Sequence, residues 1–168
     1  MTRRLVELPP EEPRREEEEE QVDLLRLVVF RVGAELHACD VLLVEEVVTG
    51  ARVHPLPDVP RPLMGVIRLR GSLVPVLDLA PVLGLRLEET ATPAVLILDA
   101  GASRIGVAAD EVREVASVPA ASLRPAPARG GEPEEHVVGV ARAGGELLTV
   151  LDLAKLLENF TLSTRDPS

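Results

Sequence analysis

Short apolar runs, separated by turn residues about every 8–12 positions, fill the chain from Leu24 onward. The runs are rich in Val, Leu and Ile, and the clearest of them are Leu25–Val32, Glu35–Ala38, Val41–Val48, Val66–Arg70 and Leu73–Leu77. Each is the length of a strand rather than of a helix, and β-branched residues favour strands. Many short strands divided by Gly and Pro turns predict a mainly β fold of the barrel or sandwich type.

The chain also contains an internal repeat. The segment Gly65–Leu83 matches Gly139–Leu157 at a constant offset of 74 residues without a gap, and 11 of the 19 aligned residues are identical. A weaker echo, at an offset of 68, links Val44–Val47 to Val112–Val115. Fixed-period self-similarity indicates that one strand-rich unit of about 70 residues is used twice.

Each copy of the repeat has the pattern of a hairpin followed by a helix start. Two strands flank a Gly-centred turn, and Asp78 or Asp152 then precedes a Leu-Ala-x-x-Leu stretch. We expect both aspartates to cap the free amides of a helix N-terminus rather than to act as paired catalytic carboxylates. Units this small bury little surface alone, so the two should pack closely, with a groove at the surface between them.

Residues 1–23 differ from the rest of the chain. They contain nine acidic residues, including the run Glu16–Glu20, against four arginines. Like-charge repulsion and scarce apolar surface predict a disordered acidic tail, although an acidic partner-binding arm is an alternative.

Composition excludes several classes of function. The net charge is −10, and Phe30 and Phe160 are the only aromatic residues, so the chain lacks both the basic surplus and the stacking rings of nucleic-acid binders. A single cysteine permits no intrachain disulfide and no metal-ligand spacing is present. The sequence has neither a secretory signal pattern nor an apolar run long enough to span a bilayer, so a cytoplasmic location is expected.

One pair of side chains in the sequence could act in nucleophilic catalysis. His37 and Cys39 are two residues apart in a predicted strand and would share a face, which leaves a thiol enzyme as a minor hypothesis. Phosphate-binding glycine loops are absent. The sequence therefore favours a binding protein without enzymatic activity, cofactor or metal.

Five short motifs follow one another along the chain: VLLVEEV from Val41, DVPRPLMGVIRLRG from Asp58, VPVLDL from Val74, LRPAP from Leu123 and EHVVG from Glu135. Through these motifs, in this order, the residues from Leu25 to Leu157 resemble the CheW-type coupling proteins of bacterial chemosensory systems. The sequence departs from the family pattern at three positions: Arg68 replaces an Asn, Pro62 a common aromatic, and His136 a common Tyr.

This resemblance implies two pseudo-repeated five-stranded SH3-like β-barrels with short helices. The implied layout is a tail at 1–23, a CheW-like domain at 24–160 and a tail at 161–168. Within the domain, sub-barrel one covers about 40–90 and sub-barrel two about 91–150, completed by the N-terminal strand and the C-terminal helix.

The implied function is that of an adaptor in a chemotaxis or motility pathway. It would couple the cytoplasmic helical hairpins of chemoreceptors to the regulatory domain of a CheA-type histidine kinase, at receptor clusters. A relative that has lost kinase binding is the alternative, and a ligand-binding barrel is a further one.

The family motifs imply five partner-binding residues, which are Val44, Glu46, Gly65, Arg70 and Gly71. The Arg70 guanidinium suits a carboxylate, either Glu46 within the fold or an acid on a receptor helix. Since Gly144 stands at the equivalent position of the second copy, the turn itself does not demand an arginine. Gly65 and Gly71 are expected to serve the backbone, because tight hairpin turns require positive φ.

Overall fold

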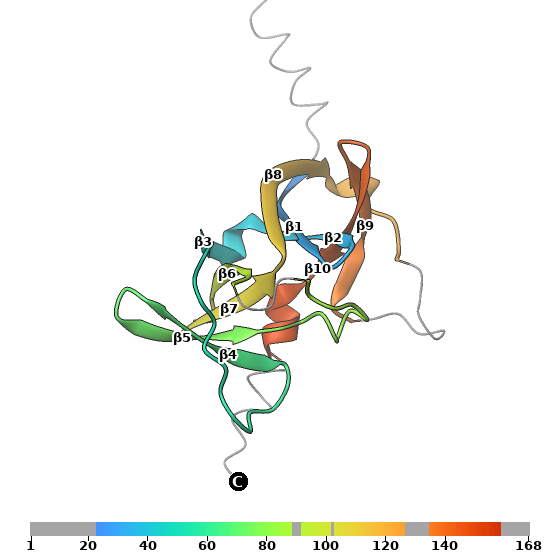
Figure 1. Cartoon of the computed structure of the whole chain (residues 1–168). Helices are drawn as coiled ribbons and strands as arrows, with labels where there is room; N and C mark the ends of the chain where they lie inside the picture. The colour runs from blue at the N-terminus through green and yellow to red at the C-terminus, as the bar shows by residue number, and fades with distance from the viewer. Residues whose placement is uncertain (1–22, 89–91, 102, 127–134, 159–168) are drawn as a thin grey trace, which may run out of the picture.

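The computed structural model describes residues 23–88, 92–101, 103–126 and 135–158 and confirms a mainly β fold (Figure 1). Its strands are β1 (Leu24–Val32), β2 (Glu35–Asp40), β3 (Val44–Val48), β4 (Leu63–Leu69), β5 (Ser72–Leu77), β6 (Ala94–Asp99), β7 (Arg104–Ala109), β8 (Glu111–Pro119), β9 (Val137–Ala143) and β10 (Glu146–Leu151). Two 3-10 turns, η2 (Val41–Leu43) and η3 (Ala120–Ser122), and a helical segment at 153–158 complete the described part. The residues of both predicted tails lie outside it, apart from Asp23.

The strands form two five-stranded sheets with the same design. The sheet of unit one has the order β3-β6-β7-β5-β4, and the sheet of unit two has the order β8-β1-β2-β10-β9. Each contains three antiparallel pairs and one parallel pair, which is β5 with β7 in unit one and β10 with β2 in unit two. This matched order is consistent with two SH3-like barrels.

The repeat reappears as matched hairpins. Strands β9 and β10 begin and end 74 residues after the corresponding ends of β4 and β5. Both hairpins carry a register shift at the same place, between Leu63 and Gly65 in one and between Val137 and Gly139 in the other. The duplicated sequence therefore encodes a duplicated local structure.

The two repeats exchange strands, so each five-stranded sheet contains strands from both of them. The first repeat supplies β1–β5 and the second supplies β6–β10, yet β6 and β7 join unit one whereas β1 and β2 join unit two. Sequence similarity locates the repeats, but it does not reveal which repeat a hairpin pairs with. Burial decides this pairing, because each hairpin completes the core of the other unit.

Strand β1 joins the two cores, as the expectation of close packing required. Its side chains alternate between two hydrophobic clusters: Val28 and Phe30 face the larger cluster with most of unit one, whereas Leu27 and Val29 face the smaller cluster of unit two. A strand buried on both faces reads as a continuous apolar run, which explains the LVVF sequence at its centre.

The two aspartates of the repeat act as caps in different settings. The backbone N–H of Lys155 donates to Asp152 Oδ1 (3.0 Å) at the start of the helical segment, as predicted. Asp78 Oδ1 accepts from the Ala80 N–H (2.9 Å), but residues 80–84 form turns rather than the expected helix. Gly84, with φ 74°, reverses the chain there, whereas the second copy continues as a helix.

A buried carboxylate secures the crossover from unit one to unit two. Asp110 lies between β7 and β8 with its side chain 1% exposed. Its Oδ2 accepts from the Gly33 N–H (2.6 Å) and its Oδ1 from the Glu88 N–H (2.7 Å). The β1–β2 turn, the connection after β5 and the crossover are thereby held at one point.

Candidate partner-binding site

Arg70 and Glu46, two of the five predicted site residues, meet on the surface of unit one. Glu46 lies on β3 and Arg70 in the β4–β5 turn, and the guanidinium donates to both carboxylate oxygens, at 3.1 Å to Oε2 and 2.5 Å to Oε1. The Arg70 side chain is 60% exposed and the Glu46 side chain is 32% exposed. Arg70 is therefore paired with Glu46 within the fold, which is the first of the two partners that were considered for its guanidinium.

The pairing affects both ionisable groups. The hydrogen bond from Arg70 lowers the pKa of the Glu46 carboxyl, and the same bond raises the pKa of the guanidinium. A neighbouring ion pair joins Arg104 to Glu45 at 3.1 Å, and the positive charge of Arg104 also contributes to the lowered pKa of Glu46. The surface thus carries fixed, oriented charges at neutral pH.

The backbone at Arg70 is in the left-handed region. Its φ is 48°, the equivalent Gly144 has φ 60°, and the glycines that follow, Gly71 and Gly145, have φ 85° and 82°. Two successive positive φ values are the geometry of a tight hairpin turn, so the prediction for Gly71 is confirmed. A side chain at a position that glycine favours costs conformational energy, which points to a use for the arginine side chain.

The reason predicted for Gly65 was wrong. Gly65 has no positive φ; instead, a Cβ at this position would lie 2.4 Å from the His54 carbonyl oxygen, where His54 bridges to Val66. Gly139 has the same role in unit two, against the Arg124 carbonyl oxygen at 2.6 Å. Val44, half-buried on β3, packs against the larger core, so it supports this surface from below.

In unit two an ion pair joins the equivalent strand and hairpin, at different positions and with the charges reversed. Arg113 on β8 contacts Glu146 at the start of β10, with Nη1 to Oε1 at 3.1 Å. In unit one the acid is on the first strand and the cation in the hairpin turn, whereas in unit two the cation is on the strand. The two units consequently present different charge patterns from the same framework.

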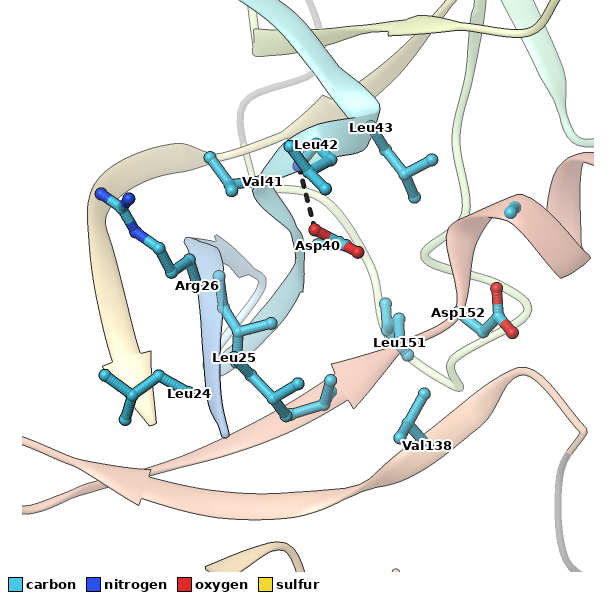
Figure 2. Close-up of a pocket in the computed structure, with 13 residues that line it drawn as sticks. Leu24, Leu25, Arg26, Asp40, Val41, Leu42, Leu43, Val138, Leu151 and Asp152 are labelled. Carbon is cyan, nitrogen blue, oxygen red and sulfur yellow. Dashed lines mark hydrogen bonds between the residues drawn. The ribbon is translucent and has the colours of Figure 1, made fainter. Parts of the chain in front are cut away.

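A second surface is an apolar groove of about 560 Å³ in unit two (Figure 2). Buried Leu27, Val150 and Leu151 form its floor. Its rim carries three largely exposed apolar side chains, Leu24 (54%), Leu42 (87%) and Val138 (52%). Exposed apolar side chains gathered around one hollow indicate a protein-binding surface.

Sequence reasoning placed a groove between the units but did not identify the residues of this one. They come from β1, η2, β9 and the start of the helical segment, which are far apart in sequence. The only local signal is the run Val41-Leu42-Leu43, which was interpreted as part of a strand but forms a 3-10 turn that projects Leu42 outward. Asp40 caps this turn by accepting from the Leu42 N–H (3.0 Å).

The His37–Cys39 pair lies inside the protein. Cys39 is fully buried in the larger core, and burial raises the pKa of its thiol to about 12. His37 is 2% exposed and stacks on Phe30, with ring centroids 6.0 Å apart. A protonated thiol without solvent access is not a nucleophile, so these residues serve packing.

The part of the chain that the structure describes contains no group of three or more His, Cys, Asp or Glu side chains placed to hold a metal ion. No helix among these residues is long and apolar enough to cross a membrane.

Comparison with known proteins gives consistent results. The family model of the CheW-like domain matches residues 26–160. The chain is 31% identical over 141 residues to the chemotaxis protein CheW of Treponema pallidum (80% of this chain, 82% of that protein) and 34% identical over 132 residues to the protein FrzA of Myxococcus xanthus (77% and 82%). Among solved structures, the scaffolding protein TtCheW of Thermoanaerobacter tengcongensis is similar with a TM-score of 0.68 at 27% identity, covering 81% of this chain and 94% of that one. The repeat, the paired five-stranded sheets and these matches together show that the chain belongs to the CheW-like domain family.

Proposed function

We propose that this protein is a non-enzymatic signalling adaptor that couples chemoreceptor helical hairpins to a CheA-type histidine kinase. The CheW-like match over residues 26–160 carries the proposal. The relatives named above are a chemotaxis protein and a scaffolding protein, which supports a role in assembly rather than in a reaction. The protein would work in the cytoplasm, recruited to receptor clusters.

The groove of unit two supplies the means of binding a receptor. An amphipathic helix binds by placing its apolar face into a hydrophobic groove, with anchors one turn apart. Leu24, Leu42 and Val138 surround such a groove from three sides and are already exposed to solvent. Exposed apolar side chains gathered around a hollow are typical of a protein interaction site.

The surface of Glu46 and Arg70 supplies the means of binding the kinase. Its paired charges have a fixed geometry and lie beside exposed Val47 on the same strand. Oriented charges at an exposed site govern partner choice and association rate more than raw affinity. We expect this charged surface to bind the regulatory domain of the kinase. The family resemblance implies that this domain has the same double-barrel fold.

The receptor arm of the proposal is tested by replacing one groove side chain. Leu42→Asp should leave the fold intact, because the side chain is exposed, and should weaken binding of a receptor-tip helical hairpin by at least about tenfold. Leu56→Asp is the matched control, since Leu56 is an exposed leucine outside the groove. Isothermal titration of the full chain with the purified hairpin measures both. Equal affinities for the two variants would contradict the assignment of the groove.

The kinase arm is tested by Arg70→Glu, with Arg142→Glu as the control on an exposed strand position of unit two. Only the first variant should lose binding to the kinase regulatory domain in a pull-down. If the wild-type chain retains the receptor hairpin but never the kinase domain, the alternative of a receptor-only scaffold replaces the proposal.

A further inference from the structure

Three charged side chains surround the groove of unit two, and they are separated by sign. Figure 2 shows Arg26, from β1, at one side of the groove and Asp152, at the start of the helical segment, at the other, with Asp40 beside η2 between them. Arg26 and Asp40 are exposed, and Asp152 is half-buried. None of the three forms an ion pair with another described residue.

The carboxylates retain capacity for a partner. Asp40 accepts from the Leu42 N–H and Asp152 from the Lys155 N–H, in each case through Oδ1. An ionised carboxylate has two oxygens with about four acceptor positions, so each can still accept from a bound chain. The groove therefore offers a cation at one side, an anion at the other and a second anion between them, and both carboxylates can still accept hydrogen bonds.

An apolar groove alone does not fix the direction of a bound helix, because a stripe of leucines presents similar contacts in either direction. Charge does fix it. A helix carries about half a positive charge at its N-terminus and about half a negative charge at its C-terminus, and charged side chains of the partner add to this asymmetry.

We propose that the groove selects the direction of the helix that it binds. The N-terminal end of the helix, bearing Lys or Arg, lies over Asp40 and Asp152, and the C-terminal end, bearing Asp or Glu, lies beside Arg26. In an antiparallel helical hairpin the two arms run in opposite directions, so this polarity chooses which arm enters the groove. The inference rests on the proposed function, because it assumes that the groove binds a helix.

Two synthetic peptides of identical composition test the inference. Both are stapled helices with the same apolar stripe; one carries Lys in its first turn and Glu in its last, and the other carries them reversed. Circular dichroism confirms equal helicity, and fluorescence anisotropy with the full chain gives the two dissociation constants. We expect about a fivefold preference for the first peptide, the size of one or two exposed charge contacts, and we expect it to shrink at high salt.

The variants separate charge from shape. Arg26→Glu should abolish or reverse the preference, whereas Arg142→Glu, away from the groove, should preserve it. Equal binding of the two peptides, or tighter binding of the reversed one, overturns the inference and leaves the helix site standing. If neither peptide binds, the helix site itself is refuted and the inference falls with it.

Discussion

Replacing Asp110 tests whether the crossover between the two units depends on one buried carboxylate. The Asp110→Ala variant removes the acceptor of two backbone N–H groups, those of Gly33 and Glu88, and a negative charge 4.0 Å from the Arg31 guanidinium. Gly33 belongs to the turn that ends β1, the strand shared by both cores. Loss of this acceptor should therefore lower the stability of the whole fold.

The magnitude follows from the two hydrogen bonds. The Gly33 N–H is partly buried, and leaving such a donor without an acceptor costs about 1–3 kcal/mol. The Glu88 N–H is nearer to solvent, where water replaces the lost acceptor in part, so it adds about 0.5–1.5 kcal/mol. Part of the loss is offset because a charge no longer has to be buried. The expected decrease in the free energy of unfolding is about 1–4 kcal/mol.

Urea unfolding, followed by circular dichroism, measures this difference. With a slope of about 2 kcal/mol per molar urea, the midpoint should fall by about 0.5–2 M. Asp99→Ala is the matched control, because Asp99 also accepts a backbone N–H, from Gly101 at 2.9 Å, but in an exposed turn. A midpoint for Asp110→Ala within about 0.3 M of the control would refute the assignment of Asp110 as the fixed point of the crossover.

Three other predictions concern single residues. Cys39, whose thiol pKa is raised to about 12 by burial, should not react with a thiol reagent at pH 8 until denaturant is added; rapid modification of the native protein would contradict its burial. Gly65→Ala should destabilise the fold by about 1–3 kcal/mol in urea melts, because the new methyl group meets the His54 carbonyl oxygen, whereas Ser72→Ala on the same hairpin should be close to neutral. Because the pKa of Glu46 is lowered in the folded state, its contribution to stability is present above the ordinary carboxyl pKa of about 4.3 and is lost as the pH falls through the lowered value, so wild type and Glu46→Gln should differ at pH 7 and converge in strong acid; a difference that persists there argues against the ion pair.

Much of the fold could be predicted from the sequence because its determinants are local. The offset of 74 residues located two hairpins whose strand bounds agree with it. The turn at Gly71 followed from the need for positive φ, and the cap at Asp152 from the chemistry of helix starts. The Glu46–Arg70 contact was one of two options that the guanidinium allowed.

The errors arose where contacts join distant parts of the chain. Gly65 is needed because the backbone at His54 passes over it, which no property of the β4 sequence reveals. The donation of a hairpin by each repeat to the other unit likewise depends on pairing between distant strands. The residues of the groove in unit two were not predicted, because Leu24, Leu42 and Val138 approach one another only in the folded chain.

The sequence by itself determined that this protein has a duplicated strand-rich unit and an acidic charge balance, because these depend on residue identity and spacing. Only the tertiary structure decided which hairpin completes which sheet and which side chains remain exposed around the groove. The physical reason is that exposure and sheet pairing are set by competition for burial among all the strands. Strand β1 is buried in both cores, because its alternating side chains pack into the two hydrophobic clusters.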